Sequence, residues 1–147
     1  MAKPAFLFPG QASQYVGMGK DLFDKYSIAK QIFKKADEIL ELELSSICFA
    51  GNEAKLKQTE ITQPAIFVHS HTVAKLLAEK HITPKAVAGH SMGEYSALVA
   101  ADAISFEAGL LAVRKRGQLM QRAGTSNPGT MAAIVGLCAV EIKEICQ

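Results

Sequence analysis

The fold is decided by residues 86–101, which read AVAGHSMGEYSALVAA. The first three residues are apolar and predict a short strand, and residues 94–101 have the composition of a helix. Between them, Gly89-His90-Ser91-Met92-Gly93 matches the pattern GxSxG. Between a strand and a helix, this pattern is typical of a tight turn that lifts the serine side chain above a sheet. We therefore expect the Ser91 hydroxyl to stand exposed where the strand ends.

Ser91 has the surroundings of a nucleophile. The two glycines of the pattern remove side chains that would collide in the turn. The helix that follows directs its N-terminus at the site, where free N–H groups and partial positive charge favour a developing oxyanion. The N–H of Met92 is therefore the first candidate for an oxyanion hole. A plainer interpretation also fits: a glycine-rich turn in which Ser91 is merely exposed.

A serine hydroxyl needs a base to take its proton, and the chain has four histidines. His90 is adjacent to Ser91, and consecutive side chains of such a turn point apart, so His90 is better explained as a partner of nearby loops. His69 and His71 lie in an apolar helical stretch, where we expect partly buried structural groups. His81 is expected at the end of that helix, where a cation favours the dipole. The residues therefore indicate a nucleophile without its base.

The rest of the chain alternates between predicted strands and helices. Ala5–Phe8 is apolar at every position, which predicts a strand buried on both faces, as in a parallel sheet covered by helices. Pro64 fits the first position of a helix that is capped by Thr62 or Gln63 and runs to about residue 81. We also expect a loop over residues 10–19 and a strand over residues 131–137. Further helices are expected after Ser27 as cap, over residues 44–49, over residues 53–57, from Ser105 as cap to about residue 122, and over residues 141–147. This alternation indicates an α/β fold with a parallel sheet.

Composition excludes several classes of protein. The 147 residues suit one domain, and a formal net charge of +2 does not support the basic stripe of a nucleic-acid-binding protein. No stretch of about 18 apolar residues occurs, so we expect no membrane span. Cys48, Cys138 and Cys146 are widely spaced, without a CxxC pair or a histidine at metal-ligand spacing, so we expect buried thiols and no metal site. These features predict a cytoplasmic protein.

Further motifs accompany the GxSxG turn along the chain. They are Phe8-Pro9-Gly10-Gln11, Gln14, Gln63-Pro64, the continuation of the turn as Glu94-Tyr95-Ser96-Ala97, Arg116-Gly117 and Met120-Gln121. In this order, over residues 6–137, they resemble the malonyl-CoA:acyl-carrier-protein transacylase family, the acyltransferases of fatty-acid and polyketide synthesis. The combination is specific, because GHSxGE with an upstream FPGQ loop and a downstream RG rarely arises by chance.

The resemblance implies a role for each site residue. Ser91 would form an acyl-serine ester with malonyl-CoA and pass the malonyl group to the phosphopantetheine thiol of acyl carrier protein, with no cofactor and no metal. The backbone N–H groups of Gln11 and Met92 would form the oxyanion hole, and Arg116 would bind the free carboxylate of the malonyl group. The other residues expected to line the pocket are Gln63 and His90.

An arginine suits this carboxylate because its planar guanidinium binds two oxygens at once. On a helix, Arg114 points about 200° away from Arg116, at roughly 100° per residue, so only one of the two can face the pocket. The Arg-Gly pair of the family selects Arg116.

The chain departs from the family in one respect. The family's catalytic histidine lies far downstream of the serine, after a small subdomain, and this chain stops at Gln147. We therefore expect an N-terminal half: residues 1–126 as an incomplete, α/β-hydrolase-like large subdomain with a nucleophile elbow, and residues 127–147 as the first strand and helix start of a ferredoxin-like small subdomain. The expected partners are malonyl-CoA, acyl carrier protein and a C-terminal half or complementing chain, with no nucleic acid and no membrane.

Two other functions share some of these features. An α/β-hydrolase-type esterase or thioesterase also carries GxSxG, but it would have an HGGG-type loop and no use for a buried arginine. The FPGQ loop and Arg116 therefore argue against it. A non-catalytic module, completed by a partner chain that supplies the histidine, agrees with the missing base.

Overall fold

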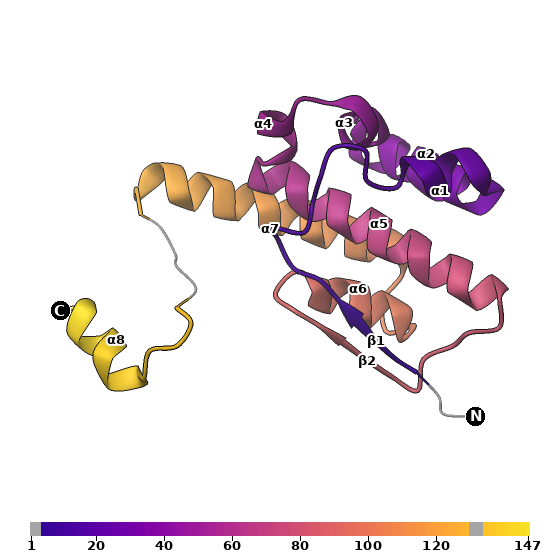
Figure 1. Ribbon diagram of the computed structural model, residues 1–147. Helices are drawn as coiled ribbons and strands as arrows, with labels where there is room; N and C mark the ends of the chain where they lie inside the picture. The colour runs from indigo at the N-terminus through magenta and orange to yellow at the C-terminus, as the bar shows by residue number, and fades with distance from the viewer. Residues whose placement is uncertain (1–3, 130–133) are drawn as a thin grey trace.

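The computed structural model describes residues 4–129 and 134–147, which form a small parallel sheet with helices packed against it (Figure 1). β1 (Ala5–Phe8) pairs with β2 (Ala86–Gly89), and the register places Phe8 opposite Gly89. α6 (Gly93–Ala100) follows β2 after a short turn. The predicted strand, turn and helix over residues 86–101 are therefore confirmed.

The helices lie in layers beside the sheet (Figure 1). α6 lies against the two strands, and α5 (Thr59–Glu79) and α7 (Phe106–Ser126) run side by side beyond it. No helix in the part of the chain that the structure describes is long and apolar enough to cross a membrane. The shorter helices on the far side of α5 are α1 (Lys20–Lys25), α2 (Ser27–Leu40), α3 (Leu44–Ala50) and α4 (Glu53–Leu56).

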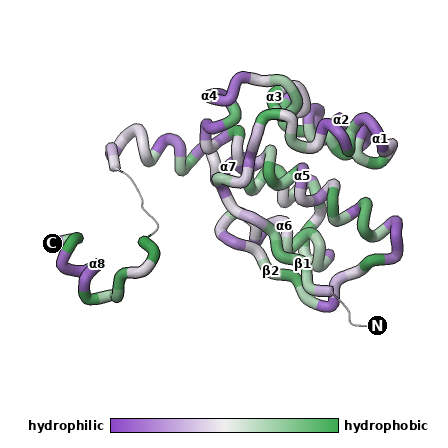
Figure 2. Tube along the Cα trace, in the orientation of Figure 1, coloured by the Kyte–Doolittle hydropathy of each residue, from purple (hydrophilic) through white to green (hydrophobic). Residues whose placement is uncertain are grey.

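The core lies where α2, α5 and α7 meet. Phe33 of α2, Phe67 of α5 and Val113 of α7 are fully buried. Phe67 stacks on Phe106 with ring centroids 5.6 Å apart, and His71 lies against the same ring at 4.5 Å. Both strands are hydrophobic (green) along most of their length in Figure 2, so the sheet also contributes apolar surface.

β1 is less buried than its apolar sequence predicts. Phe8 is buried, whereas Leu7 is 78% exposed. Successive side chains of a strand point to opposite faces, and the described helices cover only the face that carries Phe6 and Phe8. The prediction that this strand is buried on both faces is therefore wrong for the described part of the chain.

The start of α5 differs from the prediction. The helix begins at Thr59, and Pro64 lies in its interior rather than at its first position. The expected caps, Thr62 and Gln63, are both buried residues of the helix itself. The misplacement arose because a proline inside a helix normally costs a hydrogen bond, which favours reading it as a helix start.

The interior proline is tolerated because the carbonyl that loses its helical donor has another partner. Pro64 has no N–H to offer the carbonyl of Glu60, four residues before it. The guanidinium of Arg114, on α7, donates to that carbonyl with an Nη1–O distance of 2.6 Å. A contact between residues 54 positions apart thus satisfies a group that local sequence leaves unpaired.

The other helices agree with the prediction to within a few residues, with two differences. Ser105 caps α7 as predicted, and its hydroxyl accepts a hydrogen bond from the N–H of Ala108 at 3.1 Å. α1 was not predicted. The cap of α2 is Tyr26, so Ser27 is the first residue of that helix rather than its cap.

The last described helix, α8 (Ala139–Ile145), lies apart from the others in Figure 1 and has no buried residue. It begins two residues before the predicted start. The strand predicted over residues 131–137 falls in part outside the described residues, and residues 134–137 do not form a strand. The predicted strand therefore has no support in its described part.

The cysteines are only in part the buried thiols that the sequence predicts. Cys48 is buried, and burial raises the pKa of its thiol to about 12. Cys138 and Cys146 are exposed, because the helix that they flank has no buried residue. Within residues 4–129 and 134–147, no group of three His, Cys, Asp or Glu side chains is placed to hold a metal ion.

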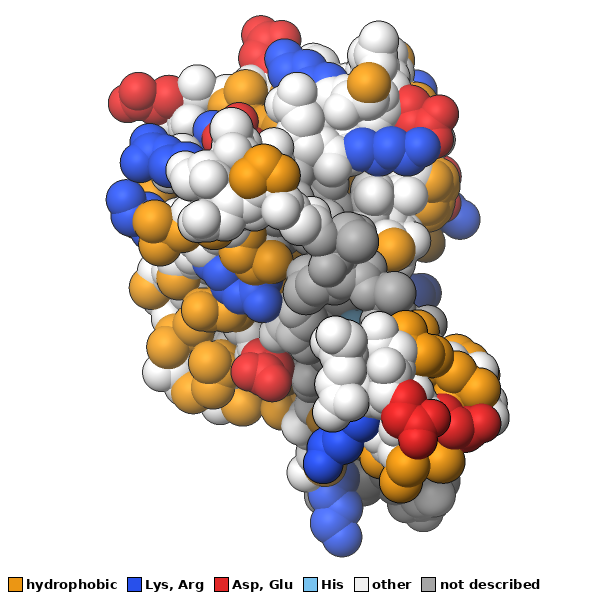
Figure 3. Space-filling model, turned by 90° about the vertical axis from the view of Figure 1, so that its left-hand side faces the viewer, with side chains coloured by type: hydrophobic (Ala, Val, Ile, Leu, Met, Phe, Trp, Pro, Cys, Tyr) orange, Lys and Arg blue, Asp and Glu red, His pale blue; other side chains and the backbone are white. Residues whose placement is uncertain are grey.

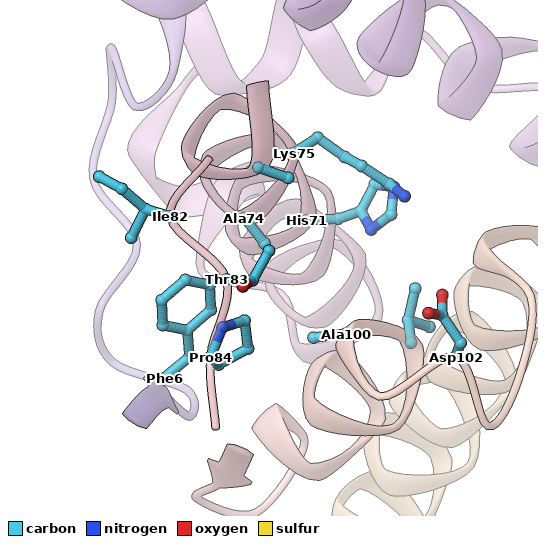
Figure 4. A pocket seen from close by; sticks show the side chains of 11 residues that line it. Phe6, His71, Ala74, Lys75, Ile82, Thr83, Pro84, Ala100 and Asp102 are labelled. Carbon is cyan, nitrogen blue, oxygen red and sulfur yellow. The ribbon is translucent and has the colours of Figure 1, made fainter. Parts of the chain in front are cut away.

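His71 is the most deeply buried of the titratable groups on α5. Its side chain is 8% exposed and lies beside Lys75 at a cavity of about 310 Å³ (Figure 4). Burial, followed by the charge of Lys75, lowers the pKa of His71 to about 4. The nearby Glu107 acts in the opposite direction and Lys35 in the same direction. The imidazole is therefore neutral in the folded protein near pH 7.

This burial predicts a loss of stability in mild acid. Between about pH 6.5 and about pH 4, the unfolded chain binds a proton at His71 and the folded chain does not, so falling pH favours unfolding. Acidification from about pH 7.5 to about pH 5 should lower the free energy of unfolding by about 2 kcal/mol through this group. His71→Leu should remove the pH dependence that comes from His71. The contribution of His69 should remain, because burial lowers the pKa of that imidazole as well. Equal pH dependence of the two proteins in urea unfolding would contradict the assignment.

Candidate active site

The turn between β2 and α6 holds Ser91 in an unusual backbone conformation. Its φ is 56°, in the left-handed region that residues with a side chain seldom adopt. The turn is fixed on both sides, because the His90 N–H donates to the Phe8 carbonyl at 3.0 Å and the Gly93 N–H donates to the His90 carbonyl at 2.9 Å. Ser91 is exposed at its tip. The prediction of a strained turn that presents the serine is thus supported by its geometry.

The glycines of the turn are required by close backbone approach. A Cβ on Gly89 would lie 2.1 Å from the carbonyl carbon of Gly93, and one on Gly93 would lie 2.4 Å from the carbonyl oxygen of Phe8. A Cβ on Gly10, in the loop after β1, would lie 2.6 Å from Nδ1 of His90. The loop that follows β1 and the turn that follows β2 are therefore packed directly against each other.

Arg116 of α7 brings the candidate site residues together. Its Nη2 donates to Oγ of Ser91 at 3.1 Å, and its Nη1 donates to Oε1 of Gln63 at 2.9 Å. Gln63 is fully buried, and its Nε2 lies 3.3 Å from Sδ of Met120. Three residues that are 25 and 53 positions apart in the chain thus form one hydrogen-bonded group.

The two nearby arginines separate as the helical spacing predicts. Arg116 reaches Ser91 and Gln63, whereas Arg114 reaches the carbonyl of Glu60. A planar guanidinium with one terminal nitrogen at the serine has the shape to bind an acyl group that carries a carboxylate. Only Arg116 of these two contacts the serine.

The two backbone amides expected in the oxyanion hole, those of Met92 and Gln11, lie in different parts of the fold. Met92 is fully buried directly before α6, at the positive end of that helix. Gln11 follows Gly10 in the loop packed against His90, and its side-chain Nε2 donates to Oγ1 of Thr59 at 3.3 Å. Within residues 4–129 and 134–147, neither the Met92 N–H nor the Gln11 N–H has a hydrogen-bond acceptor. Both amides therefore lack a protein acceptor in the described residues, and Met92 is buried while Gln11 is exposed.

The histidines do not supply a base in the described part of the chain. His69 and His71 lie on α5, within or beside the core, and His81 follows the end of that helix with a φ of 59°. His90 is adjacent to the serine but its ring lies beside Gly10. The partner of the Ser91 hydroxyl is a guanidinium, which stays protonated and cannot accept its proton. That the base lies outside this chain stays a prediction.

Sequence reasoning assigned no contact to three residues that support the site. Met120 lies against Gln63, and Gln121 accepts a hydrogen bond from the backbone N–H of Thr59 at 2.9 Å. Gly117 allows α7 to approach α5, because a Cβ there would lie 2.9 Å from Cα of Glu60. The signal that could have identified Met120 is its spacing of four residues from Arg116, which places both on one side of a helix.

The face shown in Figure 3 carries no uniform charged patch. Lys and Arg side chains (blue) are scattered there among acidic (red) and hydrophobic (orange) ones. The cavity in Figure 4 lies between β1, α5 and α6, and none of the candidate site residues lines it. The candidate active site is therefore an open surface around Ser91 and Arg116 rather than this cavity.

Comparison with known proteins gives a consistent result. Residues 5–147 match the family described as the acyl transferase domain. The chain is 49% identical over 145 residues to the malonyl CoA-acyl carrier protein transacylase of Bacillus subtilis, covering 99% of this chain and 46% of that protein. The chain therefore spans about half the length of this curated relative.

Solved structures give the same result. The malonyl CoA-acyl carrier protein transacylase from Coxiella burnetii matches with a TM-score of 0.88 at 38% identity, covering 98% of this chain and 46% of that one. A malonyl-transacylase solved in complex with a type II polyketide-synthase acyl-carrier protein matches with a TM-score of 0.79 at 40% identity, covering 83% and 40% of the two chains. The small parallel sheet and its helices are thus shared with these enzymes.

The close backbone approach in the turn predicts a large difference between two glycine substitutions. Gly89→Ala should destabilise the protein by about 3 kcal/mol, because the new methyl group meets backbone that cannot move aside. Gly124→Ala is the matched control: apart from the adjoining residues and backbone of α7 itself, no atom lies within 4 Å of its Cβ position, so it should stabilise the protein by about 0.5–1 kcal/mol. Similar urea midpoints for the two variants would contradict the packing described here.

Proposed function

The chain belongs to the acyl transferase domain family, and we propose that it forms the N-terminal half of a malonyl-CoA:acyl-carrier-protein transacylase of fatty-acid synthesis. The observation that carries the proposal is the contact of Arg116 with both Ser91 and Gln63. A cation fixed at the serine is what an enzyme needs to select an acyl group that ends in a carboxylate. The names of the relatives support malonyl-CoA and acyl carrier protein as the two substrates.

Ser91 would act as the nucleophile in both half-reactions. Its Oγ attacks the thioester carbonyl of malonyl-CoA, the bond to the coenzyme A sulfur breaks, and malonyl-serine forms. The phosphopantetheine thiol of the carrier protein then attacks the ester, and the serine oxygen leaves. In the first half-reaction the proton of the hydroxyl passes through a general base to the leaving coenzyme A sulfur, and in the second the proton of the phosphopantetheine thiol passes through the same base to the serine oxygen. By resemblance to the family, this base is a histidine beyond Gln147.

The developing oxyanion would be bound by the backbone N–H groups of Met92 and Gln11. Met92 supports this role because it lies at the positively polarised end of α6 and its N–H has no acceptor in the described residues. Gln11 supports it because its loop packs against the serine turn. Two amide donors aimed at one oxygen stabilise the tetrahedral intermediate more than the planar ester.

Arg116 would bind the free carboxylate of the malonyl group. The buried amide of Gln63 holds one side of the guanidinium, which leaves the side next to Ser91 to meet the acyl group. His90 would line the same pocket beside the loop of Gly10. An acyl group without the charge would leave the guanidinium unpaired, so the site would favour malonyl over acetyl groups.

The proposal also includes the subdomains, the lack of a cofactor or metal, and the cellular location that the sequence leads us to expect. Residues 1–126 would belong to an α/β-hydrolase-like large subdomain, for which the parallel pair β1–β2 and the turn at Ser91 are the support. Residues 127–147 would begin a ferredoxin-like small subdomain. The steps above use only side chains and backbone amides, so we propose that the reaction takes no cofactor and no metal. We place the enzyme in the cytoplasm.

A second function is favoured by one observation. The Ser91 hydroxyl contacts a guanidinium and no histidine in the described residues, which also suits a non-catalytic module completed by a partner chain. An esterase or thioesterase has less support, because its mechanism gives no role to a cation beside the nucleophile. The missing base is equally accounted for by the proposed N-terminal half.

The carboxylate role of Arg116 predicts a selective loss. In the complete transacylase, Arg116→Ala should lower kcat/KM for malonyl transfer about a hundredfold, because one charge-assisted, two-point contact is lost. Transfer of an acetyl group should change by less than about threefold, since acetyl has no carboxylate to bind. Arg122→Ala, at an exposed position of the same helix, is the matched control and should change neither rate. Equal losses with malonyl and acetyl would rule out the carboxylate role.

A further inference from the structure

The first turn of α5 has a backbone acceptor that the helix itself cannot satisfy. Pro64 lacks an N–H, so the carbonyl of Glu60 has no donor four residues further along the helix. An unpaired carbonyl in a partly buried position is costly, and the cost falls at the helical turn that leads directly to Gln63. A donor that forms a hydrogen bond with this carbonyl therefore also fixes the turn of α5 that carries Gln63.

Arg114 supplies the missing donor. Its Nη1 lies 2.6 Å from the Glu60 carbonyl oxygen, and its side chain is half-buried between the two helices. A charged donor on a neutral carbonyl forms a stronger hydrogen bond than the backbone amide it replaces. The contact lies two residues before Arg116 on the same helix. The contact that Arg114 of α7 makes with Glu60 of α5 therefore constrains where Arg116 lies.

Two more contacts on the same side of α7 act on the same turn. The Oε1 of Gln121 accepts from the Thr59 N–H at 2.9 Å, and Gly117 lets the helices approach until its Cβ position is 2.9 Å from Cα of Glu60. Positions 114, 117 and 121 are spaced by three and four residues, so they lie along one face of the helix. Arg116 and Met120 lie on the adjacent face and contact Gln63. One face of α7 thus contacts the first turn of α5, and the adjacent face contacts Gln63.

We propose that Arg114 is a positioning residue for acyl-group selection: by replacing the N–H that Pro64 lacks, it sets the alignment of α7 on α5 and thereby aims Arg116 at Ser91. This inference rests on the proposed function, because it assigns Arg114 an effect on the malonyl group through Arg116. Arg114 itself contacts neither the serine nor Gln63. Its removal should shift the guanidinium of Arg116 away from Ser91 while the nucleophile stays in place.

The link to Pro64 is tested on the 147-residue chain by a double-mutant cycle in urea unfolding. Arg114→Met keeps an apolar stem of similar length and removes the donors. Pro64→Ala restores the amide, so the Glu60 carbonyl can be satisfied within the helix. The fall in urea midpoint caused by Arg114→Met should therefore be smaller by about half when Pro64→Ala is also present. Equal falls in the two backgrounds would overturn the proposed compensation, and Arg122→Met should leave the midpoint unchanged.

The effect on acyl selection is tested in the complete transacylase by the ratio of kcat/KM for malonyl to that for acetyl transfer. Arg114→Met should lower this ratio about tenfold, and Arg114→Lys, which keeps one charged donor, should restore most of it. A merely structural role would lower both rates together and leave the ratio unchanged, which would overturn the proposal.

Arg116→Ala run in parallel separates the two claims. If it lowers the ratio and Arg114→Met does not, the positioning role is wrong and the proposed function stands. If Arg116→Ala also leaves the ratio unchanged, the proposed function is wrong and the positioning role fails with it. The urea cycle does not depend on activity, so it decides independently whether Arg114 compensates for Pro64.

Discussion

The hydrogen bonds of one guanidinium join the three elements on which the site is built. Arg116 extends from α7, reaches Ser91 at the turn between β2 and α6, and is held by the buried amide of Gln63 on α5. The donors of a guanidinium lie in one plane with fixed directions, so both contacts are made only when the two helices and the turn are in register. The packing of α5 against α7 is therefore a condition for the site as well as for the core.

The site provides stabilisation of negative charge without a group to remove a proton. The turn holds Ser91 in a left-handed conformation, the amides of Met92 and Gln11 have no acceptor in the described residues, and a cation lies 3.1 Å from the hydroxyl. Each of these favours an anion, whether an oxyanion or a carboxylate. None of them activates the hydroxyl by accepting its proton. These contacts agree with the proposed roles of Ser91 as nucleophile and Arg116 as acyl-binding group, which stay predictions.

Local features of the fold were predictable from sequence, and features that depend on distant contacts were not. The turn around Ser91 was predicted because its glycines and its flanking strand and helix lie within 16 residues, and Arg116 was selected over Arg114 by helical spacing and the family motif. The start of α5 was misplaced because the residue that compensates for Pro64 lies 50 positions away. The exposure of Leu7 was missed for a similar reason, since an apolar strand does not reveal which of its faces is covered. The roles of Gln11 and Met92 stay predictions.

We propose that Ser91 is the acyl acceptor and that its base lies outside residues 1–147. It is tested most directly by mixing the 147-residue chain with malonyl-CoA and following the mass of the protein with time. We expect very slow malonylation or none, since the partner of the hydroxyl is an arginine that cannot take its proton. Rapid, stoichiometric malonylation that is abolished by Ser91→Ala would contradict it, because one of the four histidines of this chain would then have to act as the base.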